Sequence, residues 1–398
     1  MKNLGKNRVQ RMIHLPLAST TWNEDEINII QDITASGTFT MGEKVAEYEN
    51  NFADFFGSTY AVMTNSGSSA NLIMVASLFL KKTDKLHRGD EIIVPALSWS
   101  TTYFPLQQYG LKLVFVDVDQ CTLNFDLQKL KRAISTKTRA ICAVNILGNP
   151  NDFALIKEMV NDLKIIILED NCQSMGAQFK DQYTGTFGLM GTFSTFYSHH
   201  ISTMEGGCVL TNDEELYHIL LALRAHGWTR DLPRVNQITG AKNDDAFEES
   251  FKFVVPGYNV RPTELSGAIG NIQLKKLPGF IRSRRENAAI FQEIFDGHPY
   301  IQIQKETGLS SWYGFSLVIK ESAGVNRQEL ITELTKNGVA TRPIASGSFL
   351  KQEVIKYFDY RVDGEIEATD YIDKNGFYIG NHHFDIKPQL TEISKILQ

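Results

Sequence analysis

The chain has 398 residues, a formal net charge of -6 at pH 7 and 42% hydrophobic residues. A chain of this length exceeds the usual size of one hydrophobic core, so two globular domains are expected. The negative charge disfavours binding to nucleic acid or to an acidic membrane surface, because neither polyanion would attract it.

The N-terminal sequence MKNLGKNRVQRMIHLPL is basic, but it lacks the apolar run and the small-residue cleavage site of a secretory signal. The longest apolar run, Leu72 to Leu80, is far shorter than the roughly 20 residues of a membrane helix. A cytoplasmic protein without a membrane partner is therefore expected. No metal site or disulfide framework is expected either, because the four cysteines are spread singly, at Cys121, Cys142, Cys172 and Cys208.

Along the first two-thirds of the chain, short apolar runs alternate with helical patterns, as in parallel sheets with crossover helices. The runs expected to be strands are residues 91–97, 113–118, 139–147 and 164–170. The segments expected to be helices, with apolar residues spaced at three and four, are residues 70–82, 125–134 and 152–163. The predicted class is α/β with a large doubly wound, mainly parallel sheet.

After Pro262 the pattern changes to a long, charged helical stretch that continues through Phe295, followed by a strand-like run at residues 311–319. These features predict a smaller α+β domain at the C-terminus. The expected division is an N-terminal arm at residues 1–12, a large α/β domain at residues 13–277 and a small domain at residues 278–398.

Ligands of open α/β sheets bind beyond the carboxyl ends of the strands. Asp170 directly follows the strand-like KIIILE, where its carboxylate could pair with the pyridine nitrogen of a vitamin B6 cofactor. The alternative is an Asp that caps a turn. Gly67 and Ser68 precede a helical pattern, where backbone N–H groups bind phosphate, although Ser66 could be an ordinary N-cap. Trp99 could stack on a flat ring or belong to the core.

For each of the other candidate residues, a structural role is an alternative to a functional one. Asn259, in the loop GYNVR, is either a phosphate ligand or part of a structural loop. His199 and His200 are adjacent, so their side chains point apart and do not suggest a shared metal. His382 and His383 are expected in a solvated turn, and Arg342 is either an anion ligand or a surface residue.

The motifs SGSSAN, PALSWST, ILEDNCQSMGA, FSTFYS, EGG and GYNVRP, in this order, resemble the DegT/DnrJ/EryC1/StrS family of sugar aminotransferases and dehydratases. The resemblance covers residues 13–398. It implies fold type I, the aspartate aminotransferase-like fold, with pyridoxal 5'-phosphate (PLP) or pyridoxamine 5'-phosphate (PMP) as cofactor. It also implies a homodimer whose active sites are shared.

The same resemblance assigns roles to residues of this chain. Gly67, Ser68 and Ser194 would hold the cofactor phosphate, and Trp99 would stack on the ring. Asp170 would pair with the ring nitrogen and Gln173 would lie near the ring hydroxyl. Asn259 would reach the phosphate across the dimer interface.

His199 stands where the transaminating relatives have lysine, since it lies five residues after Ser194 and six before Glu205. Histidine cannot form a Schiff base with PLP, so the cofactor would be held by contacts alone. Imidazole can still move protons near neutral pH. This combination favours dehydration, with His199 as the base.

Two groups of sugar 3-dehydratases in the family carry histidine here. One acts on a CDP-sugar and needs an iron–sulfur cluster, which dispersed cysteines do not fit. The other takes GDP-4-keto-6-deoxymannose and L-glutamate, and it is similar to this chain in the runs LPLASTTW, SHHISTMEGG and LRAHGWTRDLP. The expected role is deoxysugar synthesis for surface polysaccharide. The alternatives are a different nucleotide sugar as substrate, or a cofactor-binding regulator without activity.

Overall fold

The computed structural model describes residues 13–397, and the predicted N-terminal arm lies outside them. Its centre is an eight-stranded sheet in the order β1-β9-β8-β5-β4-β2-β3-β15. From β8 to β15 all neighbours are parallel, whereas β9 is antiparallel to β8 and β1. The predicted α/β class is therefore confirmed. The strands are β1 (Tyr60–Thr64), β2 (Glu91–Pro95), β3 (Lys112–Val116), β4 (Thr138–Val144), β5 (Ile166–Asp170), β8 (Met190–Ser194), β9 (Gly207–Thr211) and β15 (Tyr360–Val362).

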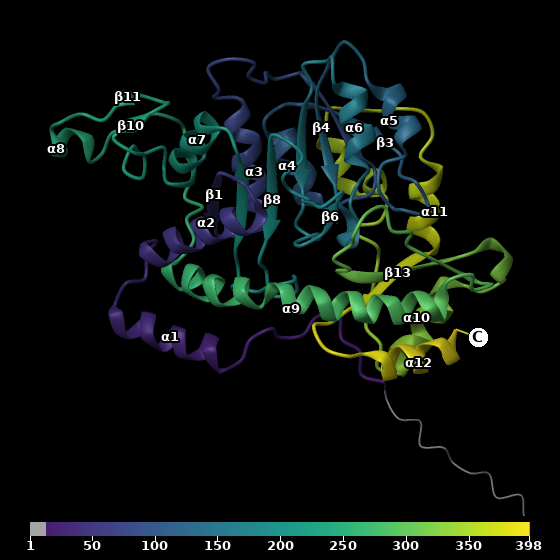
Figure 1. The fold of residues 1–398 in the computed structure, drawn as a ribbon. Coiled ribbons are helices and arrows are strands. Elements are labelled where there is room, and N and C mark those ends of the chain that lie inside the picture. The colour runs from purple at the N-terminus through teal and green to yellow at the C-terminus, as the bar shows by residue number, and fades with distance from the viewer. Residues whose placement is uncertain (1–12, 398) are drawn as a thin grey trace, which may run out of the picture.

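Helices cover both faces of this sheet (Figure 1). Ile92 and Val94 of β2 belong to the apolar cluster of one face, and Ile93 between them belongs to the cluster of the other. This alternation explains why the central strands are apolar without interruption, since both sides of each strand are buried. The helices of the first face are α3 (Gly67–Leu78), α4 (Ser100–Gln108) and α7 (Glu214–Arg224), and those of the second are α5 (Leu127–Ala133) and α6 (Phe153–Val160).

Local sequence sets the starts of these helices. Asp126, Asp152 and Asp213 are the N-caps of α5, α6 and α7, and each carboxylate accepts a hydrogen bond from a backbone N–H of the first turn. Such caps satisfy amides that have no partner within the helix. The helices predicted from spacing at residues 70–82, 125–134 and 152–163 are confirmed as α3, α5 and α6, with ends that agree to within a few residues.

A long helix, α9 (Glu264–Phe295), runs beneath the sheet and packs against α1 (Glu24–Ser36) and α2 (Glu43–Phe56) (Figure 1). Gly267 permits the close approach to α2, because a Cβ there would lie 2.6 Å from the backbone nitrogen of Val45. The helix continues through Pro278. The predicted domain boundary at residues 277/278 therefore falls inside one unbroken helix.

A second sheet of four antiparallel strands, in the order β12-β13-β16-β14, lies beyond the end of α9. The predicted strand at residues 311–319 is confirmed as β13, although its first three residues precede the strand. One part of the expected small domain lies elsewhere, because β15 pairs with β3 at the edge of the large sheet. Because β15 has only three residues, it is too short to show the alternation of apolar and polar residues by which a strand is recognised in a sequence. The elements of this part are β12 (Ile301–Ile303), β13 (Gly314–Ile319), α10 (Arg327–Lys336), β14 (Thr341–Arg342), α11 (Glu367–Asn375), β16 (Gly376–Gly380) and α12 (Lys387–Ile396).

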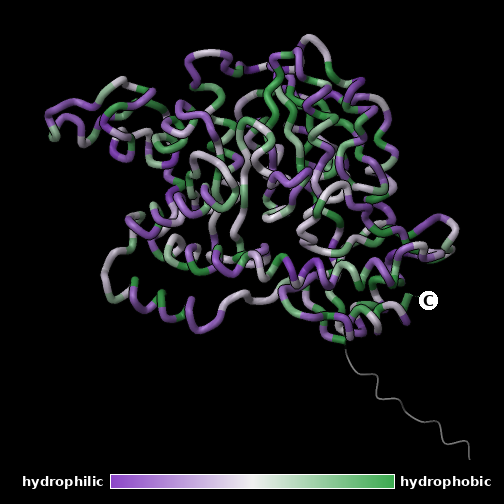
Figure 2. The backbone as a smooth tube through the Cα atoms, viewed as in Figure 1, coloured by the Kyte–Doolittle hydropathy of each residue, from purple (hydrophilic) through white to green (hydrophobic). Residues whose placement is uncertain are grey.

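A projection with β10 (Val235–Asn236), β11 (Gly240–Ala241) and α8 (Ala246–Glu249) extends from the body beside α7 (Figure 1). A short hairpin, β6 (Gln178–Phe179) and β7 (Gln182–Tyr183), follows β5. The apolar residues concentrate in the interior around the large sheet (Figure 2). Within residues 13–397, no helix has both the length and the apolar character needed to cross a membrane.

Candidate active site

Asp170 ends β5, and its buried carboxylate is held by three donors. One oxygen, Oδ2, accepts hydrogen bonds from Asn71 Nδ2 at 2.9 Å and from Thr102 Oγ1 at 2.7 Å. The other, Oδ1, accepts from the backbone N–H of Cys172 at 3.1 Å. A carboxylate has about four acceptor positions, so this one can take a further N–H donor. The protonated nitrogen of a pyridine ring is such a donor.

The residues predicted to bind the cofactor phosphate lie at the N-terminus of α3. Ser66 caps the helix, with its hydroxyl accepting from the N–H of Ser69 at 3.1 Å. The N–H groups of Gly67 and Ser68 precede the first intrahelical hydrogen bond and are available to an anion. Gly67 is required here because a Cβ would lie 2.6 Å from Cβ of Ser194. The structure thus brings the helix N-terminus and the Ser194 hydroxyl together.

Trp99 and Gln173 also follow strand ends. The Trp99 side chain is 53% exposed, at the N-cap of α4, so its indole ring is open to stacking and is not part of the core. Gln173 Oε1 accepts from the backbone N–H of Leu147 at 3.1 Å, which leaves its amide N–H groups for another partner. Along the sheet, β8, β5, β4 and β2 are successive neighbours. The residues at the ends of these strands therefore lie at one edge of the sheet, where they fit a planar ring that carries a phosphate group.

His199 lies in the loop that follows β8, and its side chain is half-buried. Its Nδ1 is shut off from solvent and has no hydrogen-bond partner. Burial lowers the pKa of His199 to about 4, while the backbone of Cys172 and the carboxylate of Asp170 act in the opposite direction. Arg284 lowers the pKa further. The imidazole is therefore neutral at physiological pH and able to accept a proton.

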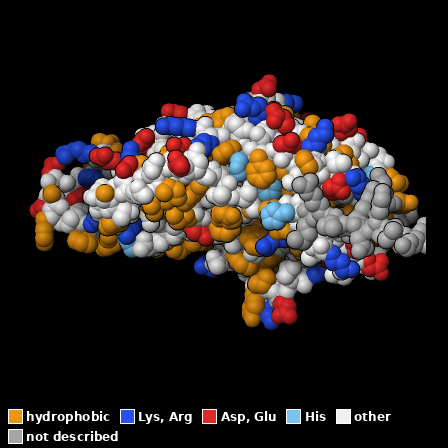
Figure 3. Space-filling view, turned by 90° about the horizontal axis from the view of Figure 1, so that it is seen from below, with side chains coloured by type: hydrophobic (Ala, Val, Ile, Leu, Met, Phe, Trp, Pro, Cys, Tyr) orange, Lys and Arg blue, Asp and Glu red, His pale blue; other side chains and the backbone are white. Residues whose placement is uncertain are grey.

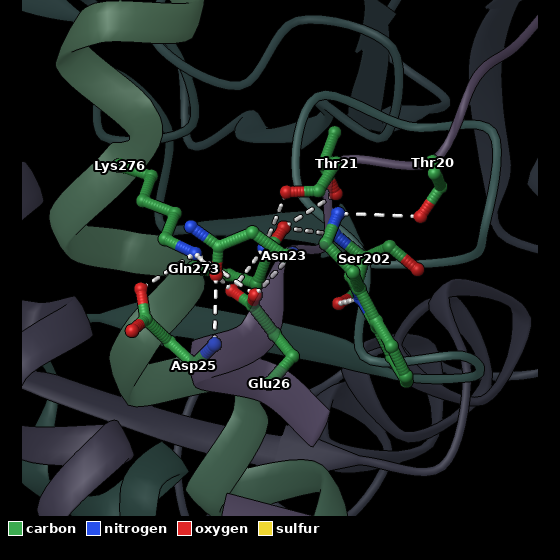
Figure 4. Close-up of polar contacts among 9 residues, drawn as sticks. Thr20, Thr21, Asn23, Asp25, Glu26, Ser202, Gln273 and Lys276 are labelled. Carbon is green, nitrogen blue, oxygen red and sulfur yellow. Dashed lines mark hydrogen bonds and ion pairs between the residues drawn. The ribbon is translucent and has the colours of Figure 1, made fainter. Parts of the chain in front are cut away.

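The His199 loop is tied to the N-terminal segment and to α9 (Figure 4). Gln273 Oε1 accepts from the N–H of Ser202 at 3.1 Å and from Thr21 Oγ1 at 2.6 Å. Its Nε2 donates to Glu26 Oε1 at 2.7 Å, and Lys276 forms an ion pair with the same carboxylate at 2.8 Å. Because Gln273 is fully buried, this network holds the loop in place from below.

Two other histidines, His200 and His382, have structural roles. His200 is fully buried, and its Nε2 lies 3.2 Å from the carbonyl oxygen of Ser311. The prediction of a solvated turn is wrong for His382, which is buried and bonded to Ser19 Oγ at 2.8 Å and to the Pro16 carbonyl at 2.9 Å. These contacts join segments from opposite ends of the chain, which no local pattern reveals. In the part of the chain that the structure describes, no cluster of His, Cys, Asp or Glu could hold a metal.

Two predicted residues stand apart from this group. Asn259 is exposed, and its Oδ1 accepts from Arg261 Nε at 3.1 Å. Arg342, in β14, is also exposed, and it pairs with Tyr378 of β16, whose ring centroid lies 6.4 Å from that of Tyr313. For both residues the ligand role stays a prediction.

Sequence reasoning missed several residues that build the site. Asn71 and Thr102 orient Asp170, and the ring of Tyr313 packs against His199 with a centroid distance of 5.3 Å. Asn71 stands in the quoted SGSSAN run, so its position beside the phosphate loop was a usable signal. Tyr313 had no such signal, because it directly precedes an ordinary apolar strand.

The fold and the arrangement at the strand ends define a class, the vitamin B6 enzymes of the aspartate aminotransferase type. The chain belongs to the DegT/DnrJ/EryC1/StrS aminotransferase family, whose profile matches residues 20–389. Solved structures at low sequence identity share the fold, such as the Helicobacter pylori aminotransferase of pseudoaminic acid biosynthesis, with a TM-score of 0.84 at 21% identity.

Relatives of much higher identity extend over almost the whole chain. GDP-4-keto-6-deoxy-D-mannose 3-dehydratase of Yersinia pseudotuberculosis is 61% identical, over 97% of this chain and 99% of its own length. The enzyme of the same name from Escherichia coli O55:H7 is 57% identical, over 97% and 100%. A solved structure of GDP-4-keto-6-deoxymannose-3-dehydratase with a trapped PLP-glutamate geminal diamine superposes with a TM-score of 0.96, at 57% identity over 97% of this chain and all of that one.

Proposed function

We propose that this protein removes the C3 hydroxyl of GDP-4-keto-6-deoxy-D-mannose, using PMP as cofactor and L-glutamate as the source of the amino group and electrons. The products are GDP-4-keto-3,6-dideoxy-D-mannose, 2-oxoglutarate and ammonia. The balance closes because glutamate is oxidised by two electrons while the C3–OH carbon is reduced by two. The oxygen leaves C3 as water, and one water is consumed when the amines are hydrolysed.

The observation that carries this proposal is His199. It is a neutral imidazole beside the Asp170 site, at the sequence position where transaminating relatives have lysine. Without a lysine amine, the chain cannot release an amino sugar by forming its own Schiff base. The 61% identical dehydratase supports the same assignment.

Some residues of the chain would bind the cofactor, and His199 would transfer protons. When bound, PMP supplies an amine that condenses with the sugar ketone and a ring that takes up electrons. Gly67, Ser68 and Ser194 would hold the phosphate, Trp99 would stack on the ring, and Gln173 would lie near the ring hydroxyl. Asp170 would hold the proton on the ring nitrogen, because a carboxylate partner stabilises the cationic ring.

His199 would move the proton at the C4′ carbon of the cofactor. Its pKa of about 4 keeps the imidazole neutral, so the base form is present before substrate binds. The imidazolium that results from protonation of His199 is a strong acid, well suited to give its proton to the departing hydroxyl. One residue would thus serve the removal and the return of the proton.

We also propose a homodimer with shared sites. Support comes from Asn259, which is exposed and bonded only to Arg261 among the described side chains, and which the family resemblance assigns to a neighbouring subunit's phosphate. The face seen from below in the view of Figure 1 shows groups of apolar side chains at its surface (Figure 3). The exposed apolar side chains of the chain include Ile27 of α1, at 49%, and Phe39, at 60%. Exposed apolar patches of this kind mark contact surfaces.

The direct test is to incubate the purified protein with PLP, L-glutamate and GDP-4-keto-6-deoxymannose and to measure the mass of the sugar product. A keto sugar lacking one oxygen, together with released ammonia, is the expected result. An amino sugar as product would contradict the mechanism. His199→Asn is the matched control, because it keeps a polar side chain of similar size but cannot act as a base.

Two alternatives give different results in the same assay. Turnover with another nucleotide keto sugar, but not with the GDP-sugar, would reassign the substrate. Cofactor binding without turnover of any sugar would favour a regulator. The ring-binding residues argue against that second case, since a scaffold does not need the Asp170 carboxylate and its three donors.

A further inference from the structure

Tyr313 meets the His199 loop from a distant part of the chain. Its ring centroid lies 5.3 Å from that of His199, with the planes at 43°, and 5.8 Å from that of His200. Its hydroxyl is 3.3 Å from Ser198 Oγ. The phenol thus contacts three successive residues of the loop, and His199 is the central one.

In the described structure, no side chain forms a hydrogen bond to the His199 ring. Its Nδ1 is buried without a partner, whereas catalytic imidazoles are commonly oriented by a carboxylate or carbonyl at this atom. Phe196 supplies a second aromatic neighbour at 6.3 Å, but that side chain is itself 42% exposed. The ring of Tyr313 is therefore the closer and better shielded surface that can set the plane of the imidazole.

The backbone around Tyr313 is held firmly. Its N–H donates to the Leu147 carbonyl at 2.9 Å. Arg284 Nη1 donates to the carbonyls of Tyr313 at 3.1 Å and Asn381 at 2.9 Å, and Asn381 Nδ2 donates to the Trp312 carbonyl at 2.9 Å. Trp312 has a φ of +47°, a conformation that non-glycine residues keep only where surrounding contacts determine it.

The Arg284 side chain has an unusual set of hydrogen-bond partners. The side chain is buried, and its partners among the described residues are backbone carbonyls, with no carboxylate in an ion pair and with Nε unpartnered. Burying a guanidinium without a counter-ion is costly, so it is kept only where its hydrogen bonds matter. Here those hydrogen bonds fix the place from which Tyr313 reaches the loop.

We propose that Tyr313 is a positioning residue for His199: its ring, anchored through Arg284, holds the imidazole in the plane needed for proton transfer. This inference rests on the proposed function, in which His199 is the base. It assigns the role to the aromatic ring and not to the phenol hydroxyl. The charged and titratable groups that face His199 from other elements are Asp170, Cys172, Arg284 and Tyr313, with His200 beside it in the loop.

The first test needs no cofactor. In the protein labelled with ¹³C at its histidine rings, His199 is assigned from the spectrum of His199→Asn and titrated by NMR. The wild-type ring is expected to show no titration between pH 8 and pH 5.5, because burial lowers its pKa to about 4. In Tyr313→Leu the pKa should rise toward the ordinary value of about 6.5 and the ring-current shift should disappear. Tyr313→Phe should behave like the wild type.

The second test follows turnover. Tyr313→Leu should lower kcat by about 100-fold with little change in KM, because a misplaced base loses proximity but not substrate binding. Its pH profile should gain an acid limb near the raised pKa. Tyr313→Phe should stay close to the wild type. The matched control is Tyr371→Leu, which removes a ring from the same apolar cluster without a contact to His199 in the described structure.

The outcomes separate this inference from the proposed function. An unchanged His199 titration and kcat in Tyr313→Leu would overturn the positioning role, as would a Tyr313→Phe variant as impaired as Tyr313→Leu. Equal changes in Tyr371→Leu would show a general loss of packing and would also overturn it. Absence of dehydration by the wild type would refute the proposed function, while the NMR titration would still decide whether Tyr313 sets the state of His199.

Discussion

The two sides of the site are held in different ways. Asp170 is fixed by direct hydrogen bonds from Asn71, Thr102 and the backbone of Cys172. His199 has an unpartnered Nδ1 and is held by ring packing and by the anchoring of its loop. A group that must keep its charge is well served by fixed donors. A group that must gain and lose a proton is better held by packing, which does not favour either state so strongly.

The largest effect on turnover is expected from substitution of His199, the residue held by packing. His199→Asn should lower turnover by about 1000-fold, because general base catalysis is lost. Cofactor binding, measured by absorbance titration with PMP, should change little, since the residues predicted to hold the cofactor lie elsewhere in the site. Turnover close to the wild-type value would remove His199 as the base.

On the hydrogen-bonded side, Asp170→Asn should lower turnover by about 100-fold, since the cationic ring loses its charged partner. The asparagine amide also brings two donors toward Asn71 and Thr102, so cofactor affinity should fall as well. Single-turnover kinetics with PMP and the GDP-sugar would measure the chemical step. A variant that binds weakly but reacts at the wild-type rate would limit Asp170 to binding.

The anchoring of the His199 loop can be tested apart from the chemistry. Gln273→Met keeps the volume of the side chain but leaves the Ser202 N–H and the Thr21 hydroxyl without their acceptor. It also removes one donor to Glu26, which keeps its ion pair with Lys276, and the free energy of unfolding should fall by about 2 kcal/mol. Urea denaturation of the protein without cofactor measures this. Gln292→Met, on the same helix, is the control, because its side chain forms no hydrogen bond in the described structure. Equal losses in both variants would contradict a specific anchor.

A smaller effect is expected at Trp99. Trp99→Ala should weaken PMP binding by about tenfold, and Trp99→Phe by less, because a smaller ring still stacks. Since the indole is 53% exposed, neither change should lower the melting temperature much. A large drop in melting temperature would instead indicate a role in the core.

The smallest effect is expected from pH. Because burial lowers the pKa of His199, its base form persists as pH falls, and kcat/KM should stay level until the pH approaches about 4. An exposed histidine would lose its base form near about pH 6.5. Rates measured from pH 8 to pH 5, with a check that the protein stays folded, distinguish the two cases. An acid limb near pH 6.5 would mean that the imidazole is less buried than the structure shows.

Much of this protein could be predicted from local patterns. The alternation of apolar runs and helical spacing predicted the α/β class, and counting from Ser194 and Glu205 placed histidine at the lysine position. Asp170 and Trp99 were predicted as cofactor-binding residues because ligands bind beyond strand ends, and the structure places Asp170 at the end of β5 and Trp99 at the start of α4. These predictions succeed because period, capping and strand-end position depend on residues close together in the chain.

The residues that contact His199 and anchor its loop come together only in the folded chain. Tyr313 reaches His199, Gln273 reaches Ser202, and His382 reaches Pro16. The structure also placed β15 in the large sheet and carried α9 through the predicted domain boundary. None of these contacts leaves a periodic or spaced signal, because each joins segments far apart in the sequence. Residues close together in the chain thus set the fold class and place a histidine in the loop after β8, while long-range packing buries that histidine and so lowers its pKa.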